Sequence, residues 1–147
     1  MENKKNIIVD KSFDLALRII DLYKKLVRTH EFVLSKQVLR SGTSIGANVE
    51  EALAAHSKKD FVARMIISHK EARETRYWLR LIERSKLINE DVTPYLNEVS
   101  DVIHILSAII STSKKNLGIP VKLFLFFFNI YLLIHPSFSF QNSILNS

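Results

Sequence analysis

The chain has 147 residues, a formal net charge of +6 at neutral pH and a hydrophobic fraction of 47%, values typical of one globular domain with a sizeable core. Cysteine is absent, which excludes disulfides, thiolate metal sites and cysteine nucleophiles. Three glycines and three prolines are too few for a turn-rich all-β protein, and the glycine spacing builds no phosphate-binding loop. The basic charge balance permits binding to nucleic acid or to another anionic surface.

The first helix is predicted to begin at a cap formed by Asp10 or Ser12 and to end near Thr29. Its apolar residues follow two adjoining stripes at helical spacing, which together make one broad hydrophobic face. The stripes consist of Phe13, Ala16, Ile20, Tyr23 and Val27, and of Leu15, Ile19, Leu22 and Leu26. Residues 1–11 contain charges and one short apolar run, so we expect no secretory signal and a cytoplasmic protein.

The second helix is predicted to run from a cap at Ser35 to about Ala55, with Val38, Ile45, Val49 and Ala52 as its apolar line. Gly42 and Gly46 are four residues apart and share one face. Each glycine costs about 1 kcal/mol relative to alanine inside a helix. We therefore expect a neighbouring helix to lie tightly against this smooth face.

The third helix is predicted to start at a Ser57 cap, with Asp60 in the position of a capping-box acid, and to stop near Lys86. It carries a heptad seam that is large at its ends and small in the middle: Phe61, Met65, Ser68, Ala72, Thr75, Leu79 and Ile82. We expect the small middle of this seam to face the glycine surface of the second helix.

The fourth helix has two alternative starts, a cap at Asn89 or a cap at Thr93 with Pro94 in the first turn, and proline favours the second. Its main apolar line consists of Val92, Leu96, Val99, Ile103, Leu106 and Ile110. Short polar links join the four helices. The pattern predicts an all-α, antiparallel up-down-up-down four-helix bundle over residues 8–116.

Residues 117–147 form a divergent tail with one lysine, no arginine and no acid. Three interpretations are open: a membrane anchor, an added core helix, or sequence that was not selected as protein. The abrupt loss of amphipathic pattern and charge favours the last. Contact with a membrane is expected only if the tail is a genuine anchor.

The pattern points to no metal site, no cofactor and no enzymatic activity. A di-metal bundle needs Glu-x-x-His on two helices, and the nearest form here is a single Asp101-x-x-His104. The nucleophile elbow Gly-x-Ser-x-Gly does not occur in the sequence.

The segment Lys70–Arg80 is dense in charge. A solvated helix face is one interpretation, and an ionic contact from Glu71 or Glu74 to Arg40 of the second helix is the other. Tyr77 and Trp78 are adjacent, so we expect their side chains to point apart, one into the core and the other toward an interface.

Basic residues recur at helical spacing along the third helix and form a stripe suited to tracking phosphates: Arg73, Arg76, Arg80 and Arg84. We call these four residues the arginine stripe. The alternative is a merely solvated helix face, which the residue pattern alone slightly favours.

Three sequence blocks, Arg40–Ala52, Ser57–Phe61 and Lys70–Leu79, resemble the bacterial four helix bundle protein family. Its members were first noticed as products of intervening sequences in large-subunit ribosomal RNA genes and are sometimes labelled ribosomal proteins. The resemblance implies an antiparallel bundle that assembles as a homo-oligomeric ring, commonly a pentamer, without catalytic residues. The structural motif positions in these blocks are Arg40, Ser41, Gly42, Ser44, Gly46, Asn48, Glu71 and Glu74.

Two functions remain open from the sequence. The first is a non-enzymatic, homo-oligomeric bundle that binds RNA or a ribonucleoprotein through basic surface residues. The alternative is a structural or protein-binding bundle with no nucleic-acid role.

Overall fold

The computed structural model describes residues 6–117, and the helices within them are α1 (Ile7–Arg28), α2 (Leu34–Leu53), α3 (Lys58–Ser85) and α4 (Thr93–Lys115). No strand occurs in this part of the chain. The bundle, apart from the last two residues of α4, belongs to one compact unit that ends at Ser113. The predicted tail lies, apart from Leu117, outside the described residues.

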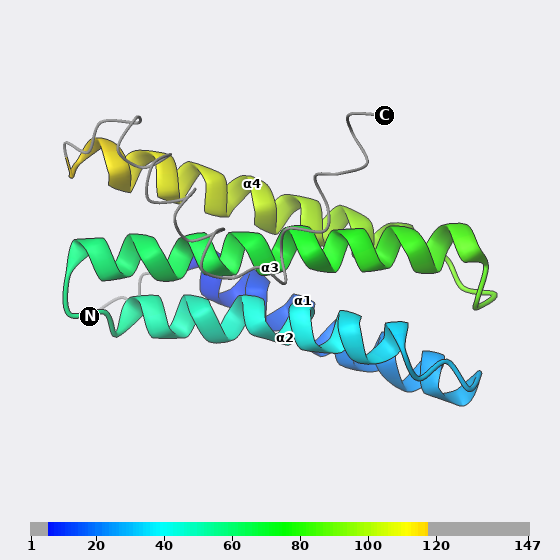
Figure 1. Cartoon of the computed structure of the whole chain (residues 1–147). Helices are drawn as coiled ribbons and strands as arrows, with labels where there is room; N and C mark the ends of the chain where they lie inside the picture. The colour runs from blue at the N-terminus through cyan, green and yellow to red at the C-terminus, as the bar shows by residue number, and fades with distance from the viewer. Residues whose placement is uncertain (1–5, 118–147) are drawn as a thin grey trace, which may run out of the picture. The chain divides into compact units, whose positions relative to one another are not determined.

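The four helices form the antiparallel up-down-up-down bundle that the sequence predicts (Figure 1). The closest backbone packing is between α2 and α3 and between α1 and α2. Side-chain contacts connect α4 to α1 and to α3, which closes the bundle. Within residues 6–117, no helix combines the length and apolar character needed to cross a bilayer.

The starts of α3 and α4 agree with the sequence-based expectation. The Ser57 hydroxyl accepts a hydrogen bond from the Asp60 backbone N–H at 3.1 Å, as a cap should. Helix α4 begins at Thr93, so the Asn89 start is wrong. The Asp91 carboxylate accepts a hydrogen bond from the Thr93 N–H at 2.9 Å.

The caps predicted for the first two helices are wrong. Helix α1 begins at Ile7, and its first turn buries the Ile8 side chain in the core. That burial favours a helix that starts before Asp10 and Ser12. Helix α2 begins at Leu34, where the Glu31 carboxylate accepts hydrogen bonds from two backbone N–H groups at 2.7 and 2.6 Å. Ser35 is fully buried instead of capping.

The core contains the predicted apolar line of α2, most of those of α3 and α4, and half of the predicted face of α1. On α4, Leu96 is half-buried, and Tyr95 and Val102 belong to the core instead. The seam of α3 is buried as predicted, except that Val62 takes the place of Phe61. On α1 only the second stripe is core, together with Ile8 and Ser12. Phe13 is 61% exposed and Leu17 is 49% exposed, so the outer side of α1 presents apolar surface to solvent.

The glycine face of α2 packs against α1, and the prediction that it faces the small middle of α3 is wrong. A Cβ atom placed on Gly42 would lie 2.8 Å from Cγ2 of Ile19 on α1. One placed on Gly46 would lie 3.6 Å from the backbone oxygen of Ser12. Both glycines therefore face α1, and the closest approach is at Gly42.

The small middle of α3 packs on the neighbouring side of α2. The Ser68 hydroxyl donates a hydrogen bond to the Ile45 carbonyl at 2.9 Å, and Thr75 Oγ1 lies 3.0 Å from Ser41 Oγ. These serine and threonine side chains are fully buried, and their hydroxyls are satisfied by the facing helix or by their own helix. Helix α2 thus uses small residues on two sides.

Candidate nucleic-acid interface

The side of α3 that faces α2 is electrostatically paired. Arg40 forms an ion pair with Glu74, and its guanidinium lies 3.8 Å from Glu71. The ionic contact that the sequence offers as one of two interpretations is therefore present. Arg40 is about half exposed, so this contact lies at the bundle surface, where ion pairs contribute little to stability.

Glu71 is the more buried of the two acids that approach Arg40. Its Oε2 atom is buried without a hydrogen-bond partner among the described residues, because 3.8 Å is too long for a hydrogen bond to Arg40. Burial raises the pKa of Glu71, and the charge of Glu74 adds to the rise. Arg40 and Lys70 act in the opposite direction without cancelling it.

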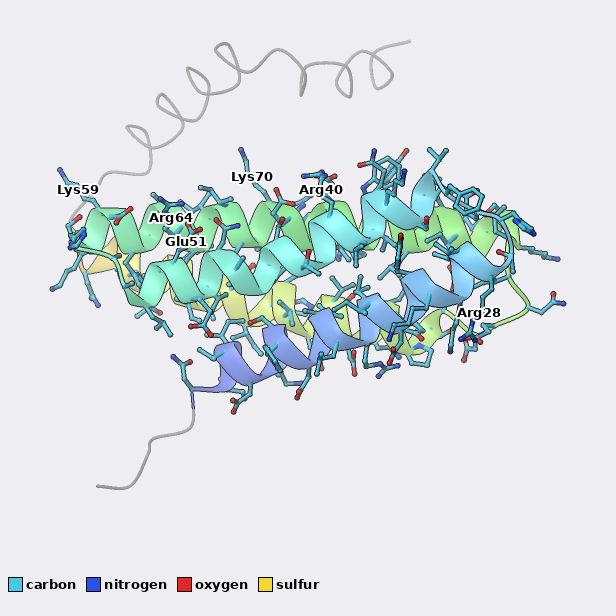
Figure 2. The ribbon with its side chains drawn as sticks, turned by 90° about the horizontal axis from the view of Figure 1, so that it is seen from below. Arg28, Arg40, Glu51, Lys59, Arg64 and Lys70 are labelled. Carbon is cyan, nitrogen blue, oxygen red and sulfur yellow. The ribbon has the colours of Figure 1, made fainter. Side chains whose placement is uncertain are left out.

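A second ion pair connects α2 and α3 nearer the start of α3. Arg64 pairs with Glu51 of α2 and lies 3.8 Å from Asp60 on its own helix. Figure 2 shows Arg64 beside Glu51, with Arg40 farther along the same side of the bundle. The arginines on this side therefore have carboxylate partners.

Three acids of α4 and of the link before it face α1. Asp101 pairs with Lys11 at 3.4 Å, Glu98 pairs with Arg18, and Glu90 pairs with Lys25 at 2.6 Å. The hydrogen bond to Glu90 raises the pKa of Lys25. We call this set of three ion pairs the α1–α4 ladder: Lys11–Asp101, Arg18–Glu98 and Lys25–Glu90.

The arginine stripe lies on the side of α3 that faces α4. His69 Nε2 lies 3.0 Å from Ser107 Oγ of α4, which identifies that side. Arg73, Arg76 and Arg80 follow His69 by 4, 7 and 11 residues, the spacings that return to the same face of a helix. Arg76 is half-buried and the other three stripe arginines are exposed.

The arginine stripe has no carboxylate partner within the described residues 6–117. None of its four side chains forms an ion pair or a hydrogen bond with another residue in the described part of the chain. On α4, the positions three and seven residues before Ser107 are His104 and Ser100, and neither is acidic. Glu83 is the acid of α3 closest to the stripe in sequence register, and it is exposed and forms no ion pair with another described residue.

The remaining predicted motif residues serve helix packing and do not join the stripe. Ser41 and Gly42 are buried against α3 and α1. Asn48 is half-buried, and its side-chain amide donates to the backbone oxygen of Ser44 at 2.8 Å. Gly46 contacts α1. Among the described residues there is no cluster of His, Asp and Glu that could hold a metal ion.

Tyr77 and Trp78 do not point apart as expected. Their ring centroids are 5.0 Å apart at an interplanar angle of 65°, an edge-to-face contact. Trp78 is half-buried against the core, and its indole N–H donates to the Glu74 carboxylate at 3.1 Å. Adjacent residues diverge by about 100° on a helix, but these two aromatic rings are large enough to meet.

The sequence gives no signal for a hollow of about 240 Å³ between α1 and α4, lined by Arg18, Asp21, Lys24, Lys25, Arg28 and Tyr95. Three of its four cations are paired with acids, namely Arg18, Lys24 and Lys25. The Arg18 guanidinium also lies 4.8 Å from the centre of the Tyr95 ring. Arg28 alone among the lining cations has no partner in the described residues, so little unbalanced charge remains here.

A family model described as 23S rRNA-intervening sequence protein matches residues 4–108. The chain belongs to this family. A solved structure of a protein of unknown function from the S23 ribosomal protein family of Bacteroides thetaiotaomicron is similar to it at 48% identity, with a TM-score of 0.68. That match covers 70% of this chain and 97% of the other. No curated protein sequence matches.

Proposed function

We propose that this family member is a non-enzymatic, cytoplasmic RNA-binding bundle whose interface is the arginine stripe. The observation that supports the proposal is the contrast between the two sides of α3. Arginines on the α2 side have carboxylate partners, whereas the four on the α4 side have none among residues 6–117. The acids that could have neutralised them are directed to α1.

The geometry of the stripe suits a phosphate backbone. Eleven residues of helix separate Arg73 from Arg84, which corresponds to about 16 Å along the axis. Four guanidiniums spread over that length can each contact a phosphate and release bound counterions. Binding to single-stranded RNA through four such contacts should therefore weaken with salt at a log–log slope of about −2.8.

Fluorescence anisotropy with a labelled single-stranded RNA of mixed sequence tests the proposal. The test variant replaces all four stripe arginines with glutamine. The matched control replaces four other exposed cations that have no partner in the described part of the chain with glutamine: Arg28, Lys36, Lys58 and Lys59. Both variants lower the formal net charge from +6 by four, to +2.

We expect the stripe variant to lose the salt-dependent binding and the control to keep most of it, because only the stripe presents its cations in one row. Equal losses in both variants would show that net charge alone attracts RNA. Absence of RNA binding by the wild-type chain would leave the structural or protein-binding bundle as its function.

We also propose that the bundle is a homo-oligomer, with the outer side of α1 in the contact between copies. Phe13 and Leu17 support this, because they are one turn apart and both are largely exposed. The ring of five implied by the family resemblance would have about five times the 17.0 kDa chain mass. Light scattering should give that mass and a smaller one for the Phe13→Gln/Leu17→Gln variant, with Val33→Gln as an exposed control. A wild-type mass of one chain would refute the assembly.

A further inference from the structure

An exposed aromatic ring lies within the arginine stripe. Tyr77 is 43% exposed, and it is the one large hydrophobic residue of α3 that is exposed to this degree. It follows Arg73 by four residues and precedes Arg80 by three and Arg84 by seven. All three spacings place neighbours on one helix surface, so Tyr77 shares its part of α3 with three arginines that form no ion pair with residues 6–117.

The Tyr77 ring is supported by a chain of contacts that leads back to α2. It meets Trp78 edge to face, with ring centroids 5.0 Å apart. The Trp78 indole N–H is held by Glu74 at 3.1 Å, and Glu74 is paired with Arg40. A tyrosine has only two side-chain torsions, so it loses little conformational entropy when its ring contacts a ligand. The surface thus has a positioned aromatic ring among flexible cations.

An exposed aromatic ring and a row of arginines recognise different parts of a nucleic acid. Arginines contact phosphates whatever the sequence or strandedness of the nucleic acid, whereas an aromatic ring can stack only on a base whose face is free. Bases of an RNA duplex are stacked on one another, and proteins therefore read unpaired nucleotides by stacking. An aromatic ring beside a row of cations favours single strands over duplexes.

We propose that the stripe takes single-stranded RNA and that Tyr77 stacks on one unpaired base while the neighbouring arginines hold the adjacent phosphates. The inference rests on the proposed RNA-binding function and adds the strandedness of the ligand and the residue that selects it. Glu74 and Trp78 act as positioning residues, since they support the Tyr77 ring without touching the RNA.

The test compares three variants on two probes by anisotropy. The probes are a single-stranded 12-nucleotide RNA of mixed sequence and the duplex formed with its complement. The variants are Tyr77→Ala, Tyr77→Phe and the matched control Phe32→Ala. Phe32 is 49% exposed and also meets another ring edge to face, that of His30, but it lies outside the stripe.

We expect Tyr77→Ala to weaken binding of the single strand by roughly 5- to 150-fold, the range for loss of one base–aromatic stack. Duplex binding should change less than twofold. The salt slope should stay at the wild-type value, because no phosphate contact is removed. Tyr77→Phe and Phe32→Ala should bind both probes within about twofold of wild type. The only tryptophan of the chain is Trp78, so its fluorescence should change on addition of the single strand to wild type and not to Tyr77→Ala.

Equal loss of single-strand and duplex binding in Tyr77→Ala, or no loss of either, would overturn the inference. A lower oligomer mass for Tyr77→Ala in light scattering would also overturn it, because the ring would then belong to a contact between copies. These outcomes differ from failure of the proposed function itself. In that case the wild-type chain would not bind RNA, or the four-glutamine stripe variant would lose no more binding than its matched control, whatever Tyr77→Ala does.

Discussion

Replacing Gly42 with alanine should destabilise the bundle, although alanine is the better helix former. The new methyl would lie 2.8 and 2.9 Å from the two γ-carbons of Ile19 and 3.2 Å from its Cβ. Ile19 is fully buried and β-branched, so it has one favoured rotamer and no free space into which to turn. Overpacking of this kind costs about 1–3 kcal/mol, and the close contacts place Gly42→Ala in the upper part of that range.

The gain in helix propensity offsets part of that cost. Exchanging glycine for alanine in a helix interior contributes about 1 kcal/mol, which leaves a net loss of about 1–2 kcal/mol for Gly42→Ala. Gly46→Ala is the matched control, because its methyl would meet only an ordinary contact at 3.6 Å. That variant should gain up to about 1 kcal/mol. The two glycines, one turn apart on the same face, should therefore respond in opposite directions.

Urea denaturation followed by far-ultraviolet circular dichroism measures both effects, at one fixed protein concentration because assembly adds to apparent stability. Combining Gly42→Ala with Ile19→Ala provides a further check. Ile19→Ala alone should cost about 2–5 kcal/mol, and the double variant should lose less than the sum, because removing the γ-carbons removes the clash. Equal stabilisation by both glycine substitutions would refute the close α1–α2 approach.

Three other changes test the contacts of α3 by the same denaturation assay. Burial raises the pKa of Glu71, so its negative charge destabilises the folded state above the folded pKa and has no effect below the unfolded pKa. Glu71→Gln should therefore raise the urea midpoint at neutral pH and leave it unchanged in strong acid. A lower midpoint at neutral pH would contradict the direction of the pKa shift. Ser57→Ala removes the hydrogen bond from the Asp60 N–H and should cost about 1 kcal/mol; an unchanged midpoint would mean that the cap contributes nothing. Glu74→Gln should cost under about 1 kcal/mol but change Trp78 fluorescence, because the indole loses a charged acceptor; unaltered emission would argue against that contact.

Local periodicity was sufficient to find most of the core but not to choose between neighbouring sides of a helix. The seam from Met65 to Ile82 was predictable because α3 buries one narrow line. On α1 both apolar stripes satisfy the helical period, and only the positions of α2 and α4 decide that Leu15 is buried and Phe13 exposed. The same limit explains the error at Gly42, since a smooth face shows that a helix packs there but not which one.

The sequence was sufficient to place the candidate site on one side of the third helix. It was not sufficient to predict whether the arginines there have acidic partners. Helical spacing alone places Arg73 and Arg80 on one side of α3. Whether they are neutralised depends on the rotation of α4 about its axis, which sends Glu98 and Asp101 to α1. The exposure of Tyr77 likewise depends on which helices flank α3. The pairing of the arginines and the exposure of Tyr77 both depend on tertiary packing, which the residue pattern of a single helix does not specify.

The α1–α4 ladder also has a consequence for encounter kinetics. The ladder neutralises the edge between α1 and α4, and ion pairs also neutralise the edge between α2 and α3. Positive potential is therefore concentrated along the stripe on the α4 side of α3, and the charge is uneven around the helix axes. A polyanion approaching within a Debye length, about 10 Å in 0.1 M salt, exerts a torque that turns the stripe toward it before contact. Glu98→Lys would remove one ion pair of the ladder and add positive charge to the edge between α1 and α4. The orienting torque would weaken, and association would slow although no stripe residue had changed.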